Sequence, residues 1–157
     1  MNITIRHVLV PVDFGPRSAK VVDFARAMGS SLHAAVHLVH VLEQPFMTAG
    51  PYEFHLPDTP ARRERLYAQA RAHLSLMAED LRLNGLVATS EIRIGRASDE
   101  IVKAAVDYGA DLIVIGRAER GGLQQLLAGG MAEQVSRRVE CPVLTVGCHG
   151  GAKMAAA

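Results

Sequence analysis

Short apolar runs rich in valine, isoleucine and leucine alternate along this chain with segments whose apolar residues recur at helical spacing. The strand-like runs lie at 3–13, 34–42, 86–94, 111–115 and 141–146, and the helical segments at 16–30, 61–84, 98–109 and 129–138. Strands separated by helices pair in parallel through right-handed crossovers. The alternation therefore predicts an α/β fold with an open, five-stranded parallel sheet and helices on both faces.

Capping residues and glycines predict where the helices begin and end. We expect Gly29 to close the first helix and Ser98 to cap the third. Along the second helix, apolar side chains every three or four residues predict one buried stripe. Its members are Leu66, Ala70, Leu74, Met77 and Leu81. The strand at 86–94 alternates more clearly than the others, which favours a place near an edge of the sheet.

The length and composition suit a single domain with an aliphatic core. The chain has 157 residues, of which 49% are hydrophobic but only 4% aromatic, and it contains no tryptophan. A chain of this size buries roughly 70% of its unfolded surface and needs no disulfide or metal to fold. We expect one domain at 1–148, followed by a flexible tail at 149–157.

The formal net charge is only +1, from 17 basic and 16 acidic side chains. Such a chain has no electric field that would capture nucleic acid or an anionic membrane. No apolar run approaches the roughly 20 residues that span a bilayer, and the first residues lack the order of a signal peptide. We therefore expect a cytoplasmic protein with neither a nucleic-acid nor a membrane partner.

Polar residues and glycines lie where two of the predicted strands end. Asp13 follows the first strand, Gly116 ends the fourth, and Gly129-Gly130 precede a helix whose free amides favour an anion. Ligands of open parallel sheets bind beyond the carboxyl ends of the strands, where the strand order reverses. These residues predict a ligand crevice there. A simpler interpretation stays open, in which Asp13 caps a turn and the glycine pair only permits a helix start.

The sequence carries no arrangement typical of catalysis or metal binding. It has no Gly-x-Ser-x-Gly motif, no Walker loop and no Gly-x-Gly-x-x-Gly. His33, His37 and His40 would share one face of a helix, but on the predicted strand His40 points away from the other two. We therefore expect neither a catalytic site nor a metal-ligand cluster.

Six segments carry a combined pattern in chain order. They are VLVPVDFGPRS at 8–18, LVHV at 38–41, GRASDEI at 95–101, DLIVIGR at 111–117, GGLQQLLAGGMAEQV at 121–135 and CPVLTV at 141–146. Together they resemble the universal stress protein family over nearly the whole chain. The resemblance implies the strand order 3-2-1-4-5 in a Rossmann-like, adenine nucleotide alpha hydrolase-like arrangement. It also implies a homodimer through the last strand, Pro142 to Val146.

One branch of that family binds ATP between the ends of the first and fourth strands. The resemblance implies that Asp13 is the acid at the ribose and adenine end, and that the backbone of Val12 and Val41 faces adenine. These positions agree with the branch. The adenosine half of the site is thus retained.

The phosphate half departs from the pattern of the ATP-binding branch. Gly116 and Gly129 match its glycines, but Glu119 replaces a glycine and Gly130 replaces a serine or threonine. A carboxylate about 4 Å from a phosphate oxygen costs roughly 4 kcal/mol at an effective dielectric constant near 20. Arg117 would offset part of that charge.

The sequence hypothesis is a non-catalytic, dimeric stress-response module that binds ATP or another adenine nucleotide. Mg²⁺ enters only as a companion of the nucleotide. Two alternatives stay open: a nucleotide-independent protein-interaction module and a slow ATPase. The candidate ligand-binding residues are Pro11, Val12, Asp13, Val41, Gly116, Arg117, Glu119, Gly129, Gly130 and Met131.

Overall fold

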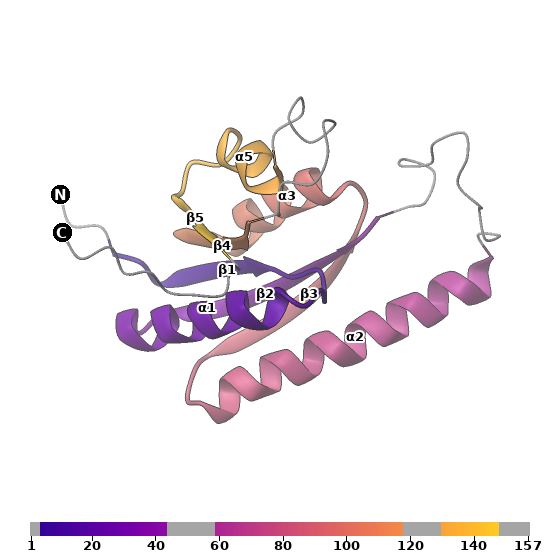
Figure 1. Ribbon diagram of the computed structural model, residues 1–157, viewed down its shortest axis with the longest axis horizontal. Coiled ribbons are helices and arrows are strands. Elements are labelled where there is room, and N and C mark those ends of the chain that lie inside the picture. Colours follow the sequence, from indigo (N-terminus) through magenta and orange to yellow (C-terminus); the bar gives the residue numbers. More distant parts are fainter. Residues whose placement is uncertain (1–3, 44–58, 118–129, 148–157) are drawn as a thin grey trace.

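Strands and helices alternate through the part of the chain that the structure describes (Figure 1). The structure is a computed structural model, and it describes residues 4–43, 59–117 and 130–147. In chain order the elements are β1 (His7–Pro11), α1 (Ser18–Leu32), β2 (Ala35–Leu42), α2 (Pro60–Leu83), β3 (Ala88–Ile94), α3 (Ala97–Tyr108), β4 (Leu112–Gly116), α5 (Met131–Ser136) and β5 (Val143–Val146). Glu119, Gly129 and the predicted tail lie outside the described residues.

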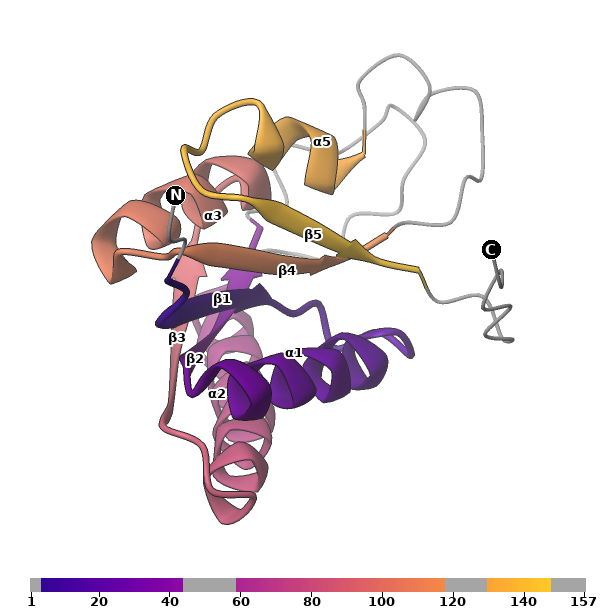
Figure 2. The same cartoon turned by 90° about the vertical axis from the view of Figure 1, so that its left-hand side faces the viewer.

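The strands form one sheet in the order β3-β2-β1-β4-β5, and every neighbouring pair is parallel. This confirms the predicted fold class, the order that the family resemblance implied, and the place of β3 at an edge. Figure 2 shows β1, β4 and β5 side by side and pointing the same way. The strand order reverses between β1 and β4, so the residues after Pro11 and after Gly116 leave the sheet next to each other.

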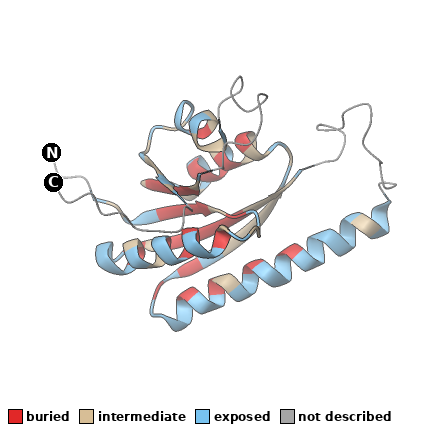
Figure 3. Ribbon diagram, viewed as in Figure 1, coloured by how far each residue is buried: buried red, intermediate tan, exposed pale blue. Residues whose placement is uncertain are grey.

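Among the described helices, α1 and α2 cover one face of the sheet, and α3 and α5 cover the other (Figure 2). Val8 and Val10 of β1 face the core formed with α1 and α2, which includes Leu74. Leu9, between them, faces the core formed with α3 and α5, which includes Ile101. Alternate residues of one strand thus supply opposite cores, as the period of two requires. Figure 3 shows the resulting burial in the central strands and on the inner sides of the helices.

The first helix does not end at Gly29, as predicted, but continues to Leu32. His33 ends it instead, in the left-handed conformation with φ 53°. A Cβ on Gly29 would lie 2.4 Å from Leu86 Cδ2 and 3.0 Å from Val36 Cγ2. Gly29 therefore allows α1 to pack closely on its neighbours and does not serve to reverse the chain.

The prediction that Ser98 caps the third helix is also wrong. α3 begins at Ala97, and Ser98 lies inside it with 2% of its surface exposed. The Ala97 N–H donates instead to Glu43 Oε1 at 3.0 Å. A carboxylate just beyond the end of β2 thus satisfies the helix start, a partner more than fifty residues away in the chain.

The second helix buries its predicted stripe only in part. Ala70, Leu74, Ala78 and Leu81 are buried, whereas Leu66 is 44% exposed. Figure 3 shows the N-terminal turns of α2 as almost wholly exposed, so the sheet-facing stripe begins after them. Although α2 is long, neither it nor any other described helix has the continuous apolar length that crossing a membrane requires.

Candidate functional site

A cavity of about 210 Å³ lies beyond the carboxyl ends of β1, β2 and β4, and we call it the crevice. It brings Asp13 and Gly116 together, as the strand order predicts. Seven of the candidate residues from the sequence line it: Pro11, Val12, Asp13, Val41, Gly116, Arg117 and Met131. The lining residues that the sequence did not indicate are Arg17, Ser18, Val21, Val39, Ala97, Ile101 and Ile115. His40 also lines it.

Asp13 is held by a tight turn between β1 and α1. Its Oδ1 accepts hydrogen bonds from the Gly15 N–H at 2.9 Å and from Ser18 Oγ at 2.8 Å. Partial burial alone would raise the pKa of Asp13, but these bonds and the charge of Arg17 outweigh burial and hold the pKa below its usual value. Among the described residues none donates to Oδ2. Asp13 is thus an ionised carboxylate with one oxygen open.

The same turn explains why glycine occupies position 15 and serine occupies position 18. A Cβ on Gly15 would lie 3.0 Å from Asp13 Oδ1, so a larger residue would push the carboxylate out of place. Ser18 is buried at the start of α1 and also accepts from the Asp13 N–H at 3.3 Å. Asp13 therefore does organise this turn, as the simpler interpretation proposed, while keeping an oxygen for a ligand.

The backbone of Val12 is largely occupied. Its N–H donates to Val39 O at 2.9 Å, and its carbonyl lies 2.7 Å from His40 Nδ1. Because a carbonyl only accepts, Nδ1 carries the hydrogen and donates it. Only the second lone pair of the Val12 carbonyl is left for a ligand.

The backbone of Val41 is placed differently. Every second residue of β2 turns its N–H and C=O toward β1, and Val39 is one of them. Val41 is the next, but β1 ends at Pro11. No hydrogen bond from the described residues reaches the Val41 backbone on that side. An adjacent donor and acceptor therefore point into the end of the crevice.

Phe14 adopts a conformation that sequence reasoning did not anticipate. Its φ of 60° lies in the left-handed region, which costs a bulky residue about 1–2 kcal/mol. Its ring packs against His40, with centroids 4.2 Å apart, and edge-on against His73 at 5.4 Å. These contacts hold the turn that presents Asp13.

Two arginines lie at the β4 side of the crevice. Arg17 Nη1 donates to the Arg117 carbonyl at 3.2 Å, so the Arg17 side chain reaches from the start of α1 to the exit of β4. The Arg117 N–H donates to Val146 O at 2.9 Å, which fixes this exit against β5. A Cβ on Gly116 would lie 3.1 Å from Val21 Cγ2, so close packing of α1 is one reason for glycine there.

Met131, at the start of α5, lines the crevice on its remaining side, whereas Gly130 is not among the lining residues. Gly130 is the residue before the helix, with φ −68° and ψ 165°, and Met131 begins it. A Cβ on Gly130 would meet no atom of the described residues within 4 Å, so close packing against them does not require glycine at this position.

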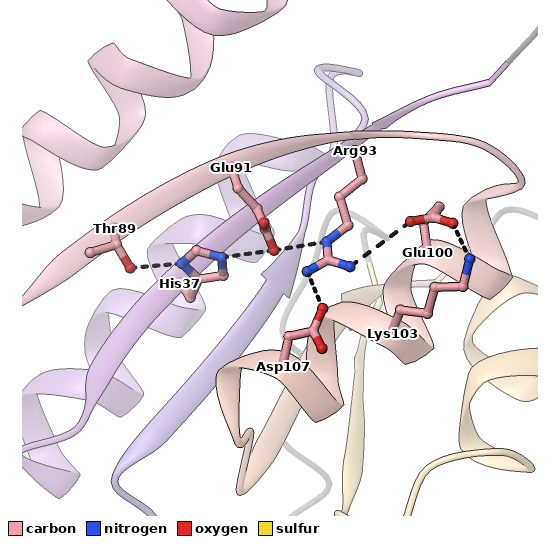
Figure 4. Close-up of polar contacts among 7 residues, drawn as sticks. All are labelled: His37, Thr89, Glu91, Arg93, Glu100, Lys103 and Asp107. Atoms are coloured by element: carbon pink, nitrogen blue, oxygen red, sulfur yellow. Dashed lines mark hydrogen bonds and ion pairs between the residues drawn. The ribbon is translucent and has the colours of Figure 1, made fainter.

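A second group of polar side chains joins β2, β3 and α3 on the face opposite α2 (Figure 4). We call it the β3 network: His37, Thr89, Glu91, Arg93, Glu100, Lys103 and Asp107. His37 contacts Thr89 Oγ1 through Nδ1 at 2.7 Å and Glu91 Oε1 through Nε2 at 3.2 Å. Arg93 Nε donates to the same Glu91 oxygen at 2.9 Å.

The three histidines of the sequence analysis lie in separate surroundings. His33 ends α1, His37 belongs to the β3 network, and His40 lies on the opposite face of β2, at the crevice. Within residues 4–43, 59–117 and 130–147, no group of three or more histidine, cysteine or acidic side chains is arranged to hold a metal ion.

Comparison with known proteins gives a consistent result. The model of the universal stress protein family matches residues 4–147. Universal stress protein A homolog 1 of Coxiella burnetii is 28% identical over 141 residues, which cover 90% of this chain and 95% of that protein.

Two solved structures have the same fold. Universal stress protein MJ0577 of Methanocaldococcus jannaschii superposes with a TM-score of 0.76 at 23% identity, covering 95% of this chain and 100% of that chain. A universal stress protein from Archaeoglobus fulgidus, solved in complex with dAMP, superposes with a TM-score of 0.63 at 21% identity. That match covers 90% of this chain and 98% of the other.

Proposed function

Since this chain belongs to the universal stress protein family, we propose that it is a non-catalytic regulatory module that binds an adenine nucleotide in the crevice. The observation that carries the proposal is the open oxygen of Asp13, which lines the same cavity as Gly116. In the bound state Asp13 accepts hydrogen bonds from the ribose hydroxyls. The backbone of Val41 contacts the adenine edge, and the phosphate end lies toward Gly116 and Met131.

The chemistry of Asp13 fits a sugar. An ionised carboxylate only accepts hydrogen bonds, and ribose offers hydroxyl donors. The lowered pKa of Asp13 keeps it ionised at neutral pH. A hydrogen bond to a charged group contributes about 1.5–3 kcal/mol.

The backbone of Val41 fits a base. Adenine presents a donor, its amino group, beside a ring-nitrogen acceptor. The open carbonyl and amide of Val41 offer the complementary pair at the end of β2. The Archaeoglobus fulgidus relative, solved in complex with dAMP, supports an adenine nucleotide as the ligand class.

We expect this chain to bind ATP more weakly than members of the ATP-binding branch, because its phosphate-binding residues differ. Gly130 has no hydroxyl to donate, and Glu119, outside the described residues, adds a carboxylate to that segment. Mg²⁺ would enter only with the nucleotide.

The test is isothermal titration of the full chain with adenosine, AMP, ADP and ATP. We expect binding of adenine nucleotides by the wild type, and an affinity about 10- to 100-fold lower for Asp13→Ala. Asp23→Ala is the matched control, because Asp23 is an exposed acid of α1 paired with Arg26. The absence of any heat with the wild type at millimolar nucleotide would overturn the proposal.

That negative result would favour a second candidate function, a nucleotide-independent protein-interaction module. The absence of a hydroxyl at Gly130 is the observation that supports it. In that case the fold and the assembly state of the chain persist while no adenine compound binds.

We further propose that the module is cytoplasmic and forms a homodimer through β5. Pro142 and Val146 direct their carbonyls to the β4 side, where the N–H groups of Ile113 and Arg117 bind them. Thr145 therefore directs its N–H and C=O to the open edge of the sheet. Open strand edges are usually covered by another chain or protected.

Thr145→Pro tests this interface, because proline removes an outward N–H and leaves the bonds to β4 in place. Light scattering after size exclusion should give a dimer for the wild type and for Thr145→Val, and a monomer for Thr145→Pro. A dimeric Thr145→Pro protein would place the interface elsewhere.

A further inference from the structure

Arg17 holds an unusual position for a charged side chain. It precedes α1, is half-buried, and lines the crevice between Asp13 and the exit of β4. Its Nη1 donates to the Arg117 carbonyl at 3.2 Å, which anchors the guanidinium at the far side of the cavity. The side chain therefore crosses from one rim of the crevice to the other.

Within the described residues, the guanidinium of Arg17 makes one hydrogen bond and has further donors available for a ligand. An arginine side chain has five N–H donors and no acceptor, and the anchoring bond uses one of them. Among the described residues, no carboxylate lies within ion-pair distance of Arg17, although Asp13 is close enough for its pKa to be lowered by the Arg17 charge. A guanidinium that lines a cavity with N–H donors available can bind a carboxylate or a phosphate through two parallel hydrogen bonds.

The two rims of the crevice thus differ in sign. Asp13 presents an open carboxylate oxygen at one rim, suited to hydroxyl groups, and Arg17 presents open N–H donors next to Arg117. A ligand that satisfies both has hydroxyls near one end and one anionic group a short distance away. A nucleoside with a single phosphate has that layout.

The size of the cavity points the same way. Its volume of about 210 Å³ is below the roughly 300–1,000 Å³ that is usual for small-molecule pockets. One phosphate brings the ligand to the guanidinium. A cavity of this size favours a ligand with one phosphate over a ligand with three.

We infer that Arg17 is the phosphate-binding residue of the crevice and that it makes the crevice a nucleoside monophosphate site. This inference rests on the proposed nucleotide function and names the ligand class and the residue that selects it. Arg17 adds affinity for the phosphate only, and Asp13 and Val41 add affinity for the nucleoside. Removing Arg17 therefore changes AMP binding and leaves adenosine binding unaltered.

The experiment is isothermal titration of the full chain with adenosine, AMP and ATP, for the wild type, Arg17→Gln and Arg17→Lys. Arg65→Gln is the matched control, an exposed arginine of α2 outside the crevice. Wild type should bind AMP about tenfold or more tightly than adenosine, and at least as tightly as ATP. Arg17→Gln should lose about 10- to 100-fold for AMP and stay within about twofold for adenosine. Arg17→Lys keeps the charge without the fork and should fall between them.

Each contrary result has a separate meaning. Equal affinity of the wild type for adenosine and AMP, or an equal loss of both in Arg17→Gln, would overturn the role of Arg17 while nucleotide binding stands. ATP binding tenfold tighter than AMP would overturn the monophosphate assignment. No binding of any compound by the wild type would overturn the nucleotide function and this inference together. The wild-type comparisons test the monophosphate assignment even where Arg17→Gln fails to fold, and Arg17→Lys then tests the side chain itself.

Discussion

The crevice and the β3 network contain the same kinds of charged side chain, but they satisfy them in opposite ways. In the β3 network, Arg93 donates to Glu91 at 2.9 Å and to Asp107 at 2.7 Å, and Glu100 lies 3.9 Å from it (Figure 4). In the crevice, Arg17 donates to a backbone carbonyl and Asp13 keeps an open oxygen.

The difference separates two uses of charge in one fold. Where charges neutralise one another inside a packed group, removing one of them leaves its partners buried without compensation and destabilises the folded chain. Charges left open in a cavity stabilise the chain little but remain available to a ligand. Substitutions in the β3 network should therefore change stability, whereas substitutions in the crevice should change ligand affinity.

The largest expected effect on stability comes from a substitution at the centre of the β3 network. Arg93 is 16% exposed and faces three carboxylates, so Arg93→Met leaves Glu91 and Glu100 without their shared cation. We expect the free energy of unfolding, measured by urea denaturation, to fall by about 2–3 kcal/mol. Nucleotide affinity should not change.

Arg137→Met is the control for that prediction. Arg137 is 73% exposed and pairs with Glu133 on the surface of α5. Because exposed ion pairs contribute little, we expect a change below about 1 kcal/mol. Equal losses in the two variants would show that the β3 network stabilises no more than a surface pair does.

The crevice could be predicted in outline because strand order dictates it. Asp13 and Gly116 follow strands that the alternating pattern makes parallel, and parallel strands release their ends at one edge of the sheet. The structure places both residues in one cavity. The pattern of apolar residues encodes the parallel sheet, and the family resemblance supplied the strand order that places these two exits side by side.

The remaining features depend on contacts between distant residues, which no local pattern encodes. Ser98 is an apt capping residue, but Glu43 reaches the same helix start from the end of β2. Arg17 resembles any arginine at a helix start until its bond to Arg117 is seen. The β3 network gave a faint signal, since Thr89 and Arg93 alternate with apolar residues and mark one polar face of β3.

The second prediction concerns the turn that presents Asp13. It separates the backbone strain of Phe14 from the contacts of its ring. The left-handed backbone of Phe14, with φ 60°, destabilises the turn, whereas its ring contacts with His40 and His73 stabilise it. Phe14→Ala removes the ring and keeps the strain, whereas Phe14→Gly removes both. We therefore expect Phe14→Gly to be about 1 kcal/mol more stable than Phe14→Ala in urea denaturation. Equal stability would show that the turn relaxes once the ring is gone.

The smallest expected effect concerns the ionisation of Asp13. Its folded pKa lies below the unfolded value of about 3.9, because the bonds from Ser18 and Gly15 and the charge of Arg17 outweigh partial burial. The ionised form therefore stabilises the folded chain above that unfolded value. The stabilisation is lost as the pH falls through the folded pKa.

Comparison of the wild type with Asp13→Asn measures this contribution. The difference in the free energy of unfolding should be constant from pH 7 to about pH 5 and should shrink below about pH 4. It should stay under about 1 kcal/mol, because the carboxylate is exposed and solvent screens it. In a Ser18→Ala background, where Oδ1 loses one donor, the same difference should shrink at higher pH. A difference that grows on acidification would mean that Asp13 is strained in its ionised form, and the open oxygen would then be no advantage to a ligand.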